Sequence, residues 1–132
     1  LHLNAQVNTG TQNKIMLPNG WSLSPAGKSL PLGDLPLNMA ISKSKKWMAV
    51  TNNGQSTQTI QLINTQSDII EDNIVVDKAW LGLAFSKDEK NLYASGGNDN
   101  WIIQYAIVNK KLKLVDKLEQ DEDVQKVYHN LK

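Results

Sequence analysis

The chain has 132 residues, of which 40% are hydrophobic and 20% charged, so it suits one globular domain and is too apolar for a disordered chain. The formal net charge of +1 provides no strong field for attracting nucleic acid. Cysteine is absent, so the chain has no disulfides or thiolate metal sites. No apolar run reaches the ~18 residues of a membrane-spanning helix, so we expect no membrane span.

The first part of the chain, residues 1–36, holds at least two candidate strands within residues 13–33. Its stretch "SPAGKSL" (24–30) resembles, weakly, the turn and strand that begin two later segments. We therefore interpret residues 1–36 as part of a structural unit that precedes two complete ones.

Two later segments repeat one pattern. "AISKSKKWMAVTNNG" (40–54) and "AFSKDEKNLYASGGN" (84–98) align at an offset of 44 residues, with Ala, Ser and two Lys identical. Beyond the turn, "TIQLI" (59–63) matches "IIQYA" (102–106) at an offset of 43, which predicts that one residue is lost in the loop. A fixed period of this length indicates a repeat architecture.

Each repeat is predicted to contain four strands, because its short runs are rich in β-branched and aromatic residues and are bounded by Gly, Asn, Ser and Lys. The short connections favour an antiparallel meander. The predicted strands are Leu37–Ile41, Trp47–Asn52, Gln58–Ile63 and Ile69–Val76, followed by Trp80–Phe85, Asn91–Ser95, Trp101–Val108 and Lys111–Leu118.

The predicted fold class is all-β. Four short strands in about 40 to 50 residues is the period of a β-propeller blade. The chain would hold part of a blade (1–36), two full blades (37–78 and 79–118) and a tail (119–132). Because propellers usually close with about 4 to 8 blades, this would be an incomplete propeller within one domain, as in a fragment of a longer protein or a chain completed by oligomerisation.

The tail places Val124, Val127, Tyr128 and Leu131 at the spacing of a short amphipathic helix. A frayed tail and the start of another blade are the alternatives. The acidic residues before it lack the glycine and the terminal glutamate of an EF-hand loop, so a solvated helix N-terminus is favoured over a calcium site. Those acidic residues are Glu119, Asp121, Glu122 and Asp123.

The stretches "LPNGWSLSPAGK", "GDLPLNMAISKSKKWMAVTNNG" and "AWLGLAFSKDEKNLYASGGNDN" resemble the YVTN-type, YncE-like or surface-layer-type propeller repeats, some of which are described as lactonase-like. The resemblance covers about residues 17–108, and its most recognisable unit runs from Ser86 to Ser95. It implies a seven-bladed bacterial propeller, sometimes fused to a phosphoesterase domain, and a periplasmic or extracellular location. No phosphoesterase segment is present, and shared folds do not carry shared activities.

No catalytic group is predicted. His2 and His129 lie at opposite ends of the chain without spaced partners, and no zincin motif, nucleophile elbow or phosphate loop occurs. We therefore expect neither a metal site nor a cofactor. No binding to nucleic acid is expected, and the predicted partners are a small molecule or protein, with further blades or other copies of the chain.

The predicted binding site is a rim of turns at one face of the propeller. In a meander, the loops between the second and third strands and the connections between blades emerge on the same face, and a rigid scaffold commonly displays functional loops. The other turns, such as "SKDEK" (86–90), would lie on the opposite face. The candidate ligand-binding residues are Asn38, Asn52, Asn53, Asp77, Trp80, Asn98, Asp99 and Asn100.

The same residues also have structural interpretations that involve no ligand. Asn and Gly in hairpins usually serve the turn, and residues 52–54 and 96–98 would supply positions that tolerate positive φ. Trp80 would open an innermost strand and either line a central channel or pack in the core, whereas Trp47 and Trp101 would pack between blades. Three functions stay open: a non-catalytic binding or scaffolding module, a fragment of a lactonase-like or phosphoesterase-linked enzyme, and a self-assembling structural unit.

Overall fold

The computed structural model describes residues 15–24 and 27–119, and the chain divides into two compact units, residues 1–31 and 32–132. In the first unit, β1 (Ile15–Met16) pairs antiparallel with β2 (Ser22–Leu23). At least two upstream strands were predicted, and two are present among the described residues. The predicted tail helix and both histidines lie outside the described residues.

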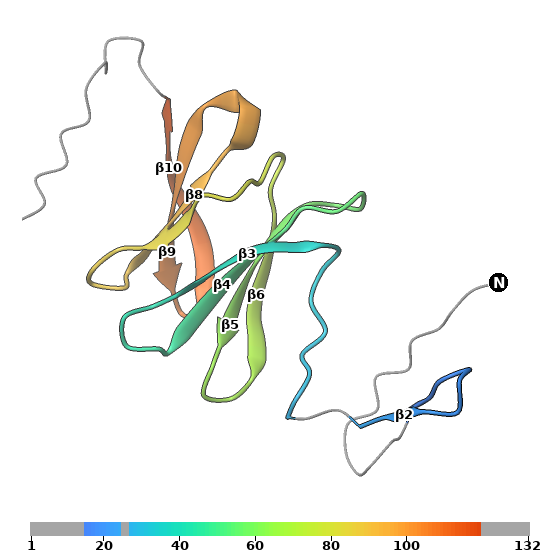
Figure 1. Ribbon diagram of the computed structural model, residues 1–132. Helices are drawn as coiled ribbons and strands as arrows, with labels where there is room; N and C mark the ends of the chain where they lie inside the picture. Colours follow the sequence, from blue (N-terminus) through green and yellow to red (C-terminus); the bar gives the residue numbers. More distant parts are fainter. Residues whose placement is uncertain (1–14, 25–26, 120–132) are drawn as a thin grey trace, which may run out of the picture. The chain divides into compact units, whose positions relative to one another are not determined.

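The second unit contains two four-stranded antiparallel sheets, each a meander of neighbouring strands (Figure 1). The predicted all-β class, the number of strands and their order are confirmed. The first sheet consists of β3 (Pro36–Ile41), β4 (Trp47–Asn52), β5 (Thr59–Asn64) and β6 (Ile69–Val75). The second sheet consists of β7 (Leu83–Phe85), β8 (Asn91–Ser95), β9 (Trp101–Val108) and β10 (Lys111–Glu119).

One strand is much shorter than predicted. The prediction began it at Trp80, but β7 begins at Leu83. The N–H of Ser95 still donates to the carbonyl oxygen of Gly82, whereas the N–H of Gly82 donates to the Ser95 hydroxyl rather than to a backbone carbonyl. The Ser95 hydroxyl thus replaces the backbone carbonyl that would accept the N–H of Gly82 in a regular sheet, and the β7–β8 pairing ends there.

The turns that join β3 to β4 and β7 to β8 repeat the same hydrogen bonds. The N–H of Ser42 donates to the carbonyl of Trp47, and that of Ser86 donates to the carbonyl of Asn91. In return, each serine hydroxyl accepts the N–H of the same residue five positions on. The fourth residue of each turn has positive φ, at Lys45 and Glu89. The repeat predicted from the sequence therefore extends to individual backbone contacts.

The offset predicted for the third strands is wrong by one residue. Met48 pairs with Ile63 across β4 and β5, and Leu92, which stands 44 positions after Met48, pairs with Tyr105 across β8 and β9. The equivalent of Ile63 is therefore Tyr105, at an offset of 42. Because side chains alternate between the faces of a strand, this single-residue difference exchanges the two faces of the third strand.

The hydrophobic core lies between the two sheets. From the first sheet it includes Trp47, Ala49, Ile60 and Leu62, and from the second Leu92, Ala94, Tyr105 and Leu112. The predicted packing of Trp47 between sheets is confirmed. At the edges, β3 lies against β7 and β6 against β10, so the two sheets stack with corresponding strands adjacent.

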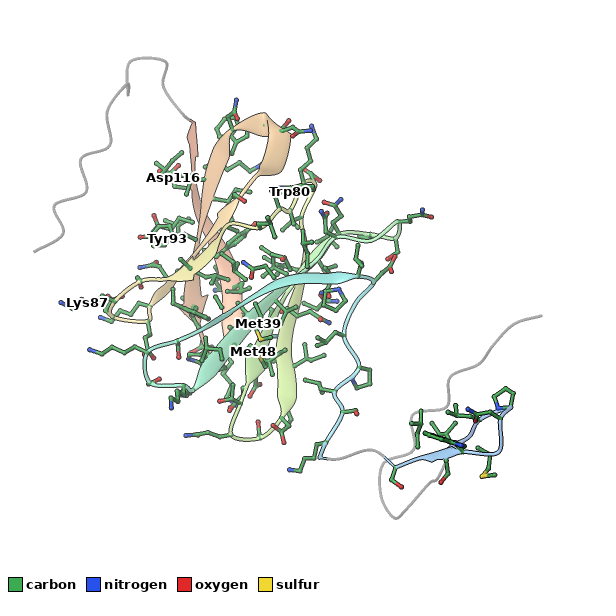
Figure 2. The ribbon with its side chains drawn as sticks, in the orientation of Figure 1. Met39, Met48, Trp80, Lys87, Tyr93 and Asp116 are labelled. Atoms are coloured by element: carbon green, nitrogen blue, oxygen red, sulfur yellow. The ribbon has the colours of Figure 1, made fainter. Side chains whose placement is uncertain are left out.

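The two sheets stack in the same sense. Ala49 faces the core, whereas its equivalent Tyr93 lies on the side of the second sheet that faces away from the first (Figure 2). Conversely, Ala94 faces the core, whereas its equivalent Val50 alternates with the core residue Ala49 and so lies on the opposite face of the first sheet. The two sheets are thus stacked head to tail, and they do not bury equivalent faces against each other.

Polar contacts fasten the outer edges of the two sheets. The carboxylate of Asp72 on β6 accepts the N–H of Leu112 at 2.7 Å and lies 3.2 Å from the ammonium of Lys111. The neighbouring carboxylate of Glu71 lies 2.8 Å from the ammonium of Lys110, and this contact is the main cause that lowers the pKa of Glu71. The charges of these strands therefore link the sheets as well as facing solvent.

At the end of the sheets away from the predicted rim, Glu89 joins two turns. Its carboxylate accepts the hydroxyl of Ser44 at 2.6 Å and the N–H of the same residue, and these bonds lower the pKa of Glu89. Since the folded pKa lies below the ordinary value, the stabilisation is present above that ordinary value and is lost as pH falls through the folded pKa.

We therefore expect Glu89→Gln to lower the midpoint of urea unfolding modestly at neutral pH, because the pair is exposed. The two midpoints should converge in acid, below the folded pKa of Glu89. Asp116→Asn is the matched control, since the carboxylate of Asp116 accepts a hydrogen bond from the N–H of the adjacent Lys117 and joins no second turn. A difference between Glu89→Gln and the parent that persists unchanged in acid would contradict the assignment.

Candidate ligand-binding rim

Three segments gather at one end of the two sheets: the turn 53–58, the connection 76–82 and the turn 96–100, here called the rim segments (Figure 1). The N–H of Ala79 in the connection donates to the side-chain oxygen of Gln58 at 2.9 Å. The ammonium of Lys78 lies 2.6 Å from the carboxylate of Asp99. These contacts link the connection to both turns, which is the arrangement expected for a shared rim.

Asn38 contacts the connection, and Trp80 belongs to it. The side-chain amide of Asn38 on β3 donates to the carbonyl of Leu81. Trp80 precedes β7 and is 55% exposed, so core packing is wrong for this side chain. A Cβ added to Gly97 would lie 3.8 Å from the Cβ of Trp80, which places Trp80 beside the second rim turn.

Asn52 ends β4 and Asn53 begins the first rim turn, and neither residue is exposed. Asn52 is only 1% exposed, and its amide donates to the hydroxyl of Thr59 and to the side-chain oxygen of Gln61, both at 3.0 Å. The side-chain oxygens of both asparagines are buried without a partner in the described structure. Residues 52–54 were expected to tolerate positive φ, but none of them adopts it, so this turn does not depend on left-handed conformations.

The second rim turn contains the 3₁₀ helix η1 (Gly97–Asp99). Gly97 and Asn100 have positive φ there, and the N–H of Asn100 donates to the carbonyl of Gly97 at 3.3 Å. The turn chemistry predicted for Gly97 is therefore present, and it extends to Asn100. Asn98 and Asp99 are exposed, and the carboxylate of Asp99 is held by Lys78.

A cleft of about 310 Å³ opens between β6 on one side and β9 and β10 on the other. Two predicted site residues, Asp77 and Asp99, line it together with Lys78 and Lys117. Its apolar lining includes Ile74, Val76, Trp101, Ile103, Tyr105 and Leu112. Trp101 therefore borders a cleft between the sheets. Asn38, Asn52, Asn53, Trp80, Asn98 and Asn100 do not line it.

Tyr105 and Lys117 were missed by the sequence reasoning. Tyr105 is only 6% exposed, and burial raises the pKa of its hydroxyl, with a further contribution from the negative charge of Asp77. Alternation along the predicted strand could have marked Tyr105 as core-facing. Lys117 reaches the cleft only because a bulge between Leu114 and Asp116 changes the register of β10, and no sequence signal indicated it.

Within residues 15–24 and 27–119, no three or more His, Cys, Asp or Glu side chains gather in a group that could hold a metal ion. The same part of the chain contains no helix with the length and hydrophobicity needed to cross a membrane. Comparisons of the chain with protein-family models and with curated proteins gave no match. The rim segments present charged side chains beside the apolar wall of the cleft.

Proposed function

We propose that the chain is a segment of a YVTN-type, YncE-like β-propeller and acts as a non-catalytic binding or scaffolding module. In this proposal the two sheets are successive blades of a longer exported bacterial protein, and the rim segments bind a small molecule or a protein. The resemblance of residues 17–108 supports the family and the periplasmic or extracellular location.

The same-sense stacking of the two sheets is the observation that carries the proposal. Two sheets related by a two-fold axis would bury equivalent faces against each other and close the assembly. Here, instead, the core covers Ala49 of the first sheet but leaves its equivalent Tyr93 outside. A head-to-tail interface of this kind can be repeated, and a ring of repeated blades is a propeller.

The outer face of the second sheet, defined by Tyr93, Ile102 and Gln104, is the position for a next blade. Ile102 is exposed there, although its equivalent Ile60 is fully buried in the first sheet. Apolar surface left open on one sheet and covered on its repeat is expected where a further sheet belongs.

Inserting a second copy of residues 77–119 directly after Glu119 tests the proposal. The inserted sheet would cover Tyr93 and Ile102 just as the second sheet covers the first. We expect the free energy of unfolding to rise by about 2 kcal/mol or more, because several aliphatic groups become buried. Urea denaturation followed by circular dichroism measures the change.

A matched control carries lysine at the positions of the inserted copy that correspond to Ala94 and Ile103. These two residues face the preceding sheet in the parent chain, so their replacement removes the apolar contact while keeping the chain length. The control should unfold at the midpoint of the parent. An insertion without lysines that unfolds no later than this control would overturn the proposed continuation of the propeller.

A further inference from the structure

The cleft between β6 and β9–β10 has the size and lining of a small ligand site. Its volume of about 310 Å³ lies at the lower end of the range of small-molecule pockets, roughly 300 to 1,000 Å³. Ile74, Val76 and Ile103 supply an apolar wall that suits an aliphatic chain. The occupant should therefore combine a short apolar part with a few polar groups.

Two opposite charges at the cleft belong to exposed residues that form no ion pair within the described part of the chain. Asp77 enters it from the connection and Lys117 from β10. Neither belongs to the ion pairs formed among the described residues, whereas Lys78 and Asp99 in the same lining pair with each other at 2.6 Å. A ligand that carries both an ammonium and a carboxylate would pair with both of these charges in place of water.

Tyr105 provides a second, independent indication. The residue is more than nine-tenths buried and lines the cleft, and its hydroxyl is not among the buried side-chain oxygens without a partner, so the oxygen is accessible from the cleft. A tyrosine hydroxyl can donate or accept a hydrogen bond, so it can bind a polar group of a ligand in the cleft. Burial and the charge of Asp77 raise the pKa of Tyr105, so the neutral hydroxyl is available as a partner for a ligand ammonium beside Asp77.

We propose that this cleft binds a free amino acid with an aliphatic side chain. The ammonium lies between Asp77 and Tyr105, the carboxylate is held by Lys117, and the side chain packs on the apolar wall. The inference names a ligand class for the proposed binding function and rests on that function.

The test uses the full chain and three probes: leucine, isoamylamine, which lacks the carboxylate, and isocaproate, which lacks the ammonium. Titrations followed by amide NMR shifts should show leucine as the tightest binder, with shifts at the cleft residues. Asp77→Asn should weaken the binding of leucine and of isoamylamine by about tenfold and leave the binding of isocaproate unchanged. Lys117→Gln should instead weaken the binding of leucine and of isocaproate.

The pattern across probes separates binding from a loss of structure, because a misfolded variant would weaken every probe alike and would change shifts throughout its spectrum without ligand. If Asp77→Asn weakened the binding of leucine and of isocaproate equally, the placement of the ammonium would be overturned. Leucine shifts confined to the turn 53–58 would overturn the cleft while leaving a binding rim in place. The absence of shifts with millimolar leucine would overturn the inference, and the blade insertion would still test the propeller separately.

Discussion

Replacing Leu92 with alanine is expected to lower the free energy of unfolding by about 3 kcal/mol, within the range of 2 to 5 measured for buried leucines. Leu92 is fully buried on β8 and belongs to the core between the two sheets. The substitution removes apolar contacts and leaves a cavity, because strands held by hydrogen bonds on both sides cannot collapse into it.

Leu118→Ala is the matched control, since Leu118 lies on β10 of the same sheet and is 46% exposed. The control should change the free energy of unfolding by less than half as much. Urea denaturation monitored by tryptophan fluorescence measures both variants, because Trp47 lies in the same core. Equal effects of the two substitutions would show that the inter-sheet core does not stabilise the unit as described.

Replacing Gly33 with alanine is expected to destabilise the unit by about 2 kcal/mol, a usual result of overpacking. A Cβ at Gly33 would lie 2.7 Å from the side-chain carbon of Asn52. Asn52 cannot simply move aside, because its amide is buried and bonded to Thr59 and Gln61. The N–H of Gly33 also donates to Gln61 at 3.2 Å, so the backbone of this segment is fixed as well.

A double-mutant cycle separates this clash from a general effect of alanine. Asn52→Ala should itself be destabilising, because the Thr59 hydroxyl loses its donor and the side-chain oxygen of Gln61 keeps only the N–H of Gly33. In that background, however, Gly33→Ala should cost less, since the amide carbon at 2.7 Å is gone and the Cβ of residue 52, at 2.9 Å, remains. Strictly additive free energies of unfolding would rule out direct contact between the two side chains as the cause.

Strand positions follow from local sequence in most of the second unit. The bounds of β4, β8 and β9 agree with the prediction, because each strand is a run of β-branched, aromatic or small residues that ends at Asn, Gly, Ser or Lys. The turn after Phe85 was also predictable, since Ser86 and Asp88 bond the local backbone. Such features need only neighbours in the chain.

The third-strand register and the cleft required the folded structure. "TIQLI" and "IIQYA" look alike, but the pairing of Tyr105 with Leu92 sets an offset that letter-by-letter similarity did not find. Likewise, the bulge in β10 brings Lys117 to the cleft opposite Asp77, which lies forty positions away in the sequence. Pairing across strands and packing between sheets decide these positions.

The sequence by itself therefore determined an all-β chain with a repeated four-strand unit, because composition and turn residues act over a few positions. Only the tertiary structure decided which face of each strand is buried and which charges meet at the rim. The physical reason is that a shift of one residue leaves local preferences almost unchanged, yet it moves every side chain of a strand to the opposite face of its sheet.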